Sequence, residues 1–324
     1  MSLGPLDPLS PECRLDPQVA HRLRDMSLLV SLPSITLRLM SLITDPNSSV
    51  KDLREVVEKD PALAAKVISL ANSSYYSVRS PIKTVDRAIT IIGYQELGFM
   101  AMGLGLNETF NINAAPEDFD GEGLWLHSLA VSWLAQRLAM KIGFPDSGEA
   151  MIAGLLHELG IIILVSKFPL LFQKLMDLIL AGHNWLAAEN ALKIRHDLVG
   201  YELAKLWKLP EVYQEAILYH HVPERARQNK VLVAMTSLSD ALSSKIGFGL
   251  KTEINEVDLG YSLSALSLTP YALQDFIRET IGKINEALPM WRQLLKSAQR
   301  PTNNSRFSSL IKDPAKSADH DGVS

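Results

Sequence analysis

Histidine and acidic side chains in apolar surroundings are the feature of this sequence best suited to chemistry. His157 and Glu158 lie side by side within the apolar run 153–160. Burying such groups is costly unless a partner satisfies them. Histidine and carboxylate are also common ligands of zinc, iron and manganese. The other residues that could share one metal site with this pair are His127, His196, His220, His221 and Asp240.

The spacing of these residues places them on five or six expected helices or helix ends. Metal sites in helical bundles draw their ligands from facing helices in this way. The side chains of His157 and Glu158 would point about 100° apart on a continuous helix. Both could then reach one metal only from a helix end, or as a bridging pair. The alternative is a set of separate histidines that make ordinary hydrogen bonds.

The elements that must position these residues all read as helices. Apolar residues recur at helical spacing along almost the whole chain, and no segment alternates for long enough to predict a strand. Asp60 followed by Pro61 is a helix start, and Thr84 can cap a helix over 85–92. One helix over 149–166 is expected to carry His157 and Glu158. The sequence therefore predicts an all-α protein.

The acidic loop 111–123, which contains Pro116, is the candidate boundary between two halves of the chain. We expect two packed helical bundles, of which the second carries the candidate metal ligands. The expected organisation is an N-terminal segment over 1–27, helical subdomains over 28–115 and 116–260, a C-terminal helical extension over 261–298 and a disordered tail over 299–324.

Composition narrows the class of protein. The chain has 324 residues, 47% of them hydrophobic, and a formal net charge of −4, so a nucleic-acid partner is not expected. The single cysteine, Cys13, fits a reducing cytoplasm. The N-terminus has no apolar segment typical of a secretory signal. The apolar stretch 150–172 is interrupted by charged residues and Pro169, so we expect buried helices there and no membrane span.

The order of several motifs resembles the HDOD family, the HD-related output domains of bacterial signalling. The most specific block is EKDPALAAKVISLANSSYY at 58–76. Further matching segments lie at 32–34, 82–93, 153–160 and 220–224. The resemblance covers about residues 28–245 and implies a helical signalling domain.

The second half is similar to the HD phosphohydrolases and to their HD-GYP branch, which cleaves cyclic-di-GMP. The resemblance implies a metal-ligand set made of a helix histidine, a His-Asp pair, a further histidine, a His-His pair and a late aspartate. Ligand-type residues stand at all of these positions, namely His127, His157 with Glu158, His196, His220 with His221, and Asp240.

Three departures from that pattern concern the chemistry. Glu158 stands where the family has aspartate, and its extra methylene shifts the carboxylate within a site that tolerates little misplacement. Ile161 stands where HD-GYP proteins have a lysine. The Gly-Tyr-Pro stretch after the His-His pair is absent, and residues 222–225 read Val-Pro-Glu-Arg. The metal ligands are thus mostly kept, and the groups that handle substrate are mostly lost.

We therefore expect a cytoplasmic signalling output or adaptor domain that binds a protein partner or a small nucleotide-like ligand and has no catalytic residues. The alternative is a metal-dependent phosphohydrolase acting on a nucleotide or cyclic dinucleotide. The cofactor implied by the resemblance is a divalent transition metal such as iron, manganese, zinc or nickel.

Overall fold

A computed structural model describes residues 8–10, 13–27, 32–110, 119–248 and 259–298. Within these ranges the regular structure is helical and no strand occurs, which confirms the predicted fold class. The expected disordered tail over 299–324 lies outside the described residues. The helices of the first half are α1 (Pro17–Ser27), α2 (Ser34–Thr44), α3 (Val50–Glu58), α4 (Pro61–Ala71), η2 (Ser74–Tyr76), α5 (Val85–Ile92) and α6 (Tyr94–Phe110).

The second half begins with α7 and continues to the end of the described chain. Its helices are α7 (Gly121–Ile142), α8 (Ser147–Leu156), α9 (Leu159–Lys167), α10 (Pro169–Leu180), α11 (Trp185–Leu192), α12 (His196–Leu206), α13 (Glu211–Tyr219), η4 (Pro223–Arg225), α14 (Lys230–Ser243), the π-helical turn η5 (Ser244–Phe248), α15 (Leu259–Ala265) and α16 (Pro270–Ala298).

Local signals read from the sequence start several of these helices. The Asp60 carboxylate accepts hydrogen bonds from the backbone N–H groups of Ala62 and Leu63, and Pro61 takes the first helical position of α4. The Thr84 hydroxyl accepts a bond from the backbone N–H of Arg87 and caps α5. Both helix starts confirm the predicted caps, because each cap satisfies backbone groups that have no partner within the helix.

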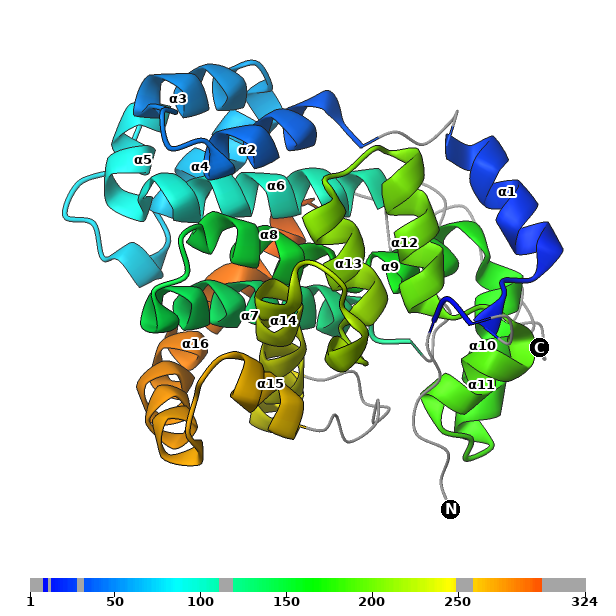
Figure 1. Cartoon of the computed structure of the whole chain (residues 1–324). Coiled ribbons are helices and arrows are strands. Elements are labelled where there is room, and N and C mark those ends of the chain that lie inside the picture. Colours follow the sequence, from blue (N-terminus) through cyan, green and yellow to red (C-terminus); the bar gives the residue numbers. More distant parts are fainter. Residues whose placement is uncertain (1–7, 11–12, 28–31, 111–118, 249–258, 299–324) are drawn as a thin grey trace, which may run out of the picture.

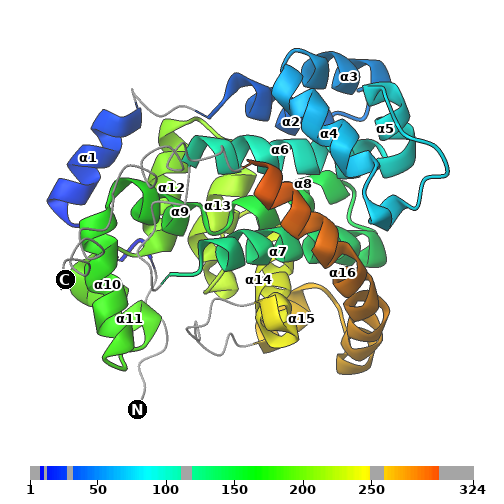
Figure 2. The ribbon, with the colours of Figure 1, turned by 180° about the vertical axis from the view of Figure 1, so that it is seen from behind.

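The first half gathers α2–α5 at one end of the molecule, and α6 runs from them across the middle (Figure 1). Seen from behind, α16 crosses the back of the molecule (Figure 2) and contacts α4, α6 and α7. One hydrophobic core includes buried residues from α1 to α16. The division into subdomains at residue 116 therefore stays a prediction about organisation within a continuous core.

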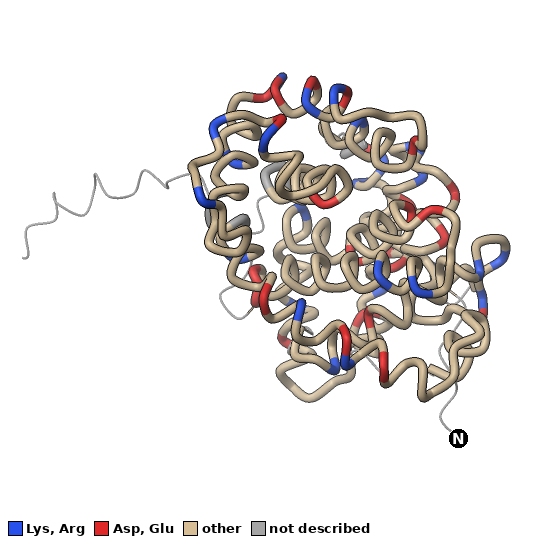
Figure 3. Tube along the Cα trace, turned by 90° about the vertical axis from the view of Figure 1, so that its left-hand side faces the viewer, with Lys and Arg blue, Asp and Glu red and all other residues tan. Residues whose placement is uncertain are grey.

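Acidic and basic residues are interspersed with each other along the chain (Figure 3), in keeping with the small net charge. The 21-residue stretch Ser147–Lys167 is long and apolar enough to cross a membrane, but 94% of its most apolar window is buried inside the protein. Helices α5 and α6 pass the same test only when joined across a bend of 113°. Such burial is typical of core helices.

A candidate metal centre

The helix predicted over 149–166 is broken where His157 and Glu158 lie. Helix α8 ends at Leu156 and α9 begins at Leu159, and Glu158 has φ −94° and ψ 19°, outside the helical range. The single-helix prediction was therefore wrong at this point. The break places both side chains at helix ends, the arrangement in which neighbouring residues can reach the same site.

Two glycines allow the site-bearing helices to approach closely. A Cβ at Gly154 of α8 would lie 2.7 Å from the Cα of Ser132 on α7, and the Ser132 hydroxyl donates to the Met151 carbonyl over 2.5 Å. A Cβ at Gly160 of α9 would lie 1.8 Å from the carbonyl oxygen of His196, the first residue of α12. Only glycine fits such backbone-to-backbone contacts.

The first group of candidate ligands is His127 on α7, His157 after α8 and Asp240 on α14. The Nε2 atoms of the two histidines lie 3.1 Å apart. The Asp240 Oδ1 lies 3.2 Å from Nε2 of His127 and 3.9 Å from Nε2 of His157. Three facing helices thus bring three potential ligand atoms to one point.

The second group is Glu158 before α9, His196 on α12, and His220 and His221 after α13. The Nε2 of His196 lies 3.4 Å from Glu158 Oε2, 3.4 Å from Nε2 of His220 and 3.0 Å from Nε2 of His221. This group therefore offers four potential ligand atoms.

The two groups adjoin each other. Glu158 Oε1 lies 3.9 Å from Nε2 of His157, and His221 Nδ1 lies 4.0 Å from Asp240 Oδ2. All seven residues singled out from the sequence therefore lie in one cluster, with the carboxylate of Glu158 between the two groups.

Hydrogen bonds at the outer nitrogens fix how four of the imidazoles face the cluster. The Nδ1 of His127, His157 and His220 lies 2.6, 2.8 and 2.7 Å from the backbone carbonyls of Phe248, Gly154 and Ile217. The Nδ1 of His196 lies 2.7 Å from a carboxylate oxygen of Glu189. Because these oxygens only accept, we assign the hydrogen of each neutral ring to Nδ1 and the lone pair to Nε2.

This assignment tests whether the residues suit a metal. If all four rings were neutral, the lone pairs of His127 and His157 would face each other, as would those of His196 and His220, so a proton or a cation must lie between the nitrogens of each pair. Both carboxylate oxygens of Glu158 are buried without a hydrogen-bond partner. A tetrahedral ion with ligand bonds of about 2.0–2.1 Å separates its ligands by about 3.3–3.4 Å, close to the 3.0–3.9 Å found here. The donor set and its spacing therefore fit a divalent metal.

Burial and neighbouring charges shift the pKa values in the cluster. Burial lowers the pKa of His220 to about 4 and raises the pKa of Glu158 to about 7. Burial also acts to lower the pKa of His196, but the carboxylates of Glu189 and Glu158 outweigh it and raise this pKa to about 10. In the metal-free protein a proton therefore stays on His196, and a metal ion would have to displace it.

Access to the cluster is restricted. The side chains of His157, Glu158 and His196 are 0% exposed, whereas those of His221 and Asp240 reach 6% and 9%. Ile161, at the position where HD-GYP proteins have a lysine, is also fully buried, in α9. The arrangement provides potential metal ligands and an apolar side chain at position 161.

One residue beside the site, Glu189, was not identified by the sequence analysis. Glu189 on α11 is fully buried and accepts a hydrogen bond from His196. It lies in the run WLAAENAL, which carries no metal-site motif. A glutamate seven residues before a candidate ligand is the only sequence signal, and it is not specific.

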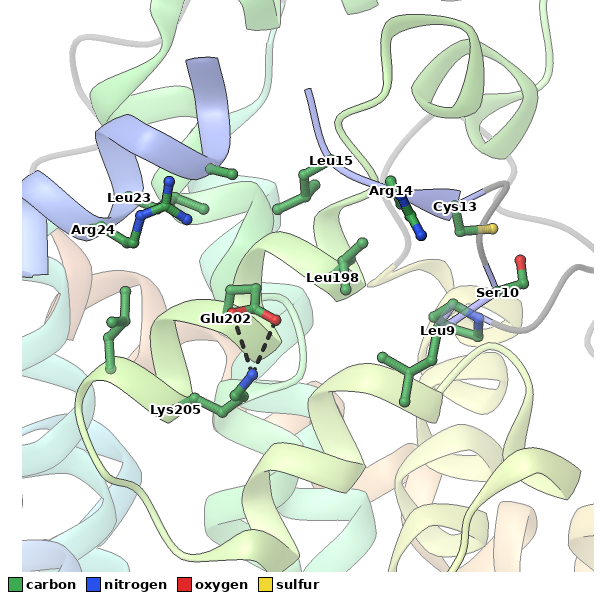
Figure 4. Close-up of a pocket in the computed structure, with 13 residues that line it drawn as sticks. Leu9, Ser10, Cys13, Arg14, Leu15, Leu23, Arg24, Leu198, Glu202 and Lys205 are labelled. Atoms are coloured by element: carbon green, nitrogen blue, oxygen red, sulfur yellow. Dashed lines mark hydrogen bonds and ion pairs between the residues drawn. The ribbon is translucent and has the colours of Figure 1, made fainter. Parts of the chain in front are cut away.

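A separate cavity of about 600 Å³ lies beside α12, between that helix, α1 and the segment preceding α1 (Figure 4). Its lining is largely apolar, with the paired side chains of Glu202 and Lys205 at one side. Cys13, also in its lining, accepts a hydrogen bond from Arg195 over 3.6 Å. None of the seven clustered residues belongs to the described lining of this cavity.

Comparison with known proteins agrees with the motif order. Residues 29–223 match the HDOD domain family. A curated relative from Treponema pallidum (strain Nichols), called an uncharacterized protein, is 24% identical over 232 residues. The match covers 70% of this chain and 44% of the relative, so the chain spans less than half the length of that protein.

Solved structures share the fold. A candidate signal transduction protein from Marinobacter aquaeolei VT8 has a TM-score of 0.72 at 24% identity, with 87% of this chain and 64% of that chain covered. An HDOD domain protein of unknown function from Geobacter sulfurreducens has a TM-score of 0.69 at 24% identity, covering 87% and 98%. A candidate phosphohydrolase from Shewanella amazonensis SB2B has a TM-score of 0.62 at 20% identity, covering 87% and 98%.

Proposed function

Because this chain belongs to the HDOD domain family, we propose that it is a signal-transduction output domain that binds divalent transition metal and does not hydrolyse phosphoesters. The proposed location is the cytoplasm. The proposed partner is a signalling protein or a small nucleotide-like ligand.

The observation that supports metal binding is the convergence of seven buried ligand-type side chains, of which Glu158 has no hydrogen-bond partner at either carboxylate oxygen. His127, His157 and Asp240 would hold one ion, and His196, His220 and His221 a second. Glu158 lies between the two groups and could contact both ions. Imidazole and carboxylate ligands suit iron, manganese, zinc and nickel.

The same site supports a non-catalytic role. Phosphoryl transfer depends on positioned charge around the phosphate, and the position that would supply a lysine holds the buried Ile161. The segment after the His-His pair begins with Val222, which is 1% exposed, and continues as the short helix η4. A phosphodiester would therefore meet an enclosed metal centre that lacks this cation.

The position of Glu158 favours a second candidate, a metal-dependent phosphohydrolase. A carboxylate shared by two adjacent ligand groups is the layout of a two-metal hydrolase. When bound, metal ions in such a site supply a hydroxide by lowering the pKa of a bound water. The candidate substrate class is a nucleotide or a cyclic dinucleotide.

One experiment separates the two candidates. Metal content is measured on the protein as purified and after incubation with manganese or iron, followed by turnover assays with cyclic-di-GMP, pGpG and a generic phosphodiester. The His157→Ala variant serves as control. We expect bound metal that is reduced in the variant, and no turnover. Metal-dependent turnover above roughly 1 per second, an ordinary enzyme rate, that disappears in His157→Ala would establish the hydrolase. A protein that takes up no metal would contradict the metal-binding proposal.

A further inference from the structure

We infer that Glu189 is a positioning residue for the metal centre, acting through His196 on the second ligand group. This inference rests on the proposed metal binding. Glu189 makes no hydrogen bond or ion pair with the other six clustered residues, and its effect would reach the metal only through the imidazole of His196.

The contacts of Glu189 are directed at one ring. Its Oε1 accepts from Nδ1 of His196 over 2.7 Å and from the backbone N–H of His196 over 3.3 Å. The same oxygen accepts from Nε1 of Trp185 over 2.9 Å, one turn earlier on α11. Trp185 thus fixes the direction of the carboxylate, and the carboxylate fixes both the ring and the helix start of α12.

The chemistry of this contact differs from that at three of the other clustered histidines. His127, His157 and His220 direct Nδ1 at neutral backbone carbonyls, whereas His196 directs it at a carboxylate. A carboxylate partner holds the hydrogen on Nδ1 and makes Nε2 a stronger donor to a metal. His196 also lies closest to the centre of the second group, within 3.4 Å of an atom of each other member.

Because Glu189 is buried, its contact with His196 should have a large effect on the energy of the site. Glu189 is 0% exposed and its Oε2 has no hydrogen-bond partner. A buried carboxylate without a positive partner is costly. The imidazole of His196, with a metal cation bound at its Nε2, would compensate the negative charge of Glu189. Removing the charge should weaken metal binding in the second group and leave the first group, on α7, α8 and α14, unaffected.

The test compares Glu189→Gln with a matched control, Glu215→Gln. Glu215 is 6% exposed and accepts hydrogen bonds from the backbone N–H groups of Arg227, Gln228 and Asn229, so it is another buried, multiply bonded carboxylate. Its carboxylate bonds to none of the clustered histidines. Each variant is titrated with Co²⁺, followed by visible absorption, with total metal content and thermal unfolding measured in parallel.

We expect the wild type to bind two Co²⁺ ions. In Glu189→Gln one of the two binding steps should lose about 10–100-fold in affinity, the usual effect of removing such a partner, with the other step unchanged. Glu215→Gln should melt at a lower temperature with both affinities kept. Equal affinities in Glu189→Gln and wild type would overturn the inference and leave the metal proposal standing, as would equal losses at both steps. A wild type that binds no Co²⁺ would instead overturn the metal proposal itself.

Discussion

Replacing Gly160 by alanine should push α12 away from α9 and move His196 out of reach of Glu158. The added Cβ would lie 1.8 Å from the carbonyl oxygen of His196, 2.6 Å from its carbonyl carbon and 3.0 Å from the backbone nitrogen of Gly200. Ordinary contact begins at 3.4 Å, so the helices must separate by about 1.6 Å, the difference between 3.4 and 1.8 Å. Because the atoms are backbone, no side-chain rotation relieves the contact.

The expected cost combines two effects. Overpacking in a core typically costs about 1–3 kcal/mol, and this contact is at the severe end because both sides are backbone. Against this, alanine stabilises a helix by up to about 1 kcal/mol relative to glycine. A net loss of about 2 kcal/mol lowers the melting temperature of a domain of this size class by about 4–8 °C. Metal ligands must keep their geometry within about 0.5 Å, so the second ligand group should lose its ion.

The matched control is Gly282→Ala in α16. No atom lies within 4 Å of the Cβ position at this glycine, so the substitution should be neutral or stabilising by up to about 1 kcal/mol. Thermal unfolding by circular dichroism and Co²⁺ stoichiometry are measured for both variants. The reasoning is refuted if Gly160→Ala melts within 1 °C of wild type, an interval well below the effect of about 1 kcal/mol, and still binds two ions.

Three further expectations follow from the same packing and charges. Gly154→Ala should remove the ion of the first group, because its Cβ would lie 2.7 Å from Cα of Ser132; metal analysis showing a full complement would contradict this. Asp146→Ala should cost about 1 kcal/mol in urea unfolding without changing metal content, because its carboxylate only caps α8 through the N–H groups of Gly148 and Glu149. In the chelator-treated protein the stability contributed by His196 should be fully present below pH 6.5 and be lost as the pH rises toward 10, since its folded pKa is raised to about 10. The melting temperature should therefore fall over this pH range in the wild type and not in a His196→Asn variant. An identical fall in the variant would show that other groups cause it.

Short-range signals in the sequence were enough to predict the helices, and resemblance to a known pattern was enough to predict which residues form the cluster. Asp60 with Pro61, and Thr84, are short-range signals whose hydrogen bonds involve residues two or three positions away. Such signals act within one turn and can be read without the fold. The seven candidate ligands were ordered by resemblance to a known pattern, and the structure brings all seven together. Whether they hold metal stays a prediction.

The features missed from the sequence depend on long-range packing. The apolar run around His157 predicts a continuous helix, yet the chain turns there, and α9 lies against α12 with Gly160 beside His196 and Gly200. Glu189 gave no motif, because its role comes from the position of α11 beside the start of α12. Neither effect is encoded within one helical turn of the residue concerned, so periodicity and capping could not show them.

If the protein is non-catalytic, as proposed, the cluster still has a physical role. The ligand-type residues lie on or directly beside α7, α8, α9, α12, α13 and α14. A metal that binds only the folded arrangement stabilises it in proportion to its affinity, so occupancy would hold these helices together. Without metal, the facing lone pairs and the unpartnered Glu158 carboxylate need protons, and a proton cannot join three helices as a metal can. In a signalling domain, metal occupancy could therefore change the packing of the helices without any reaction being catalysed.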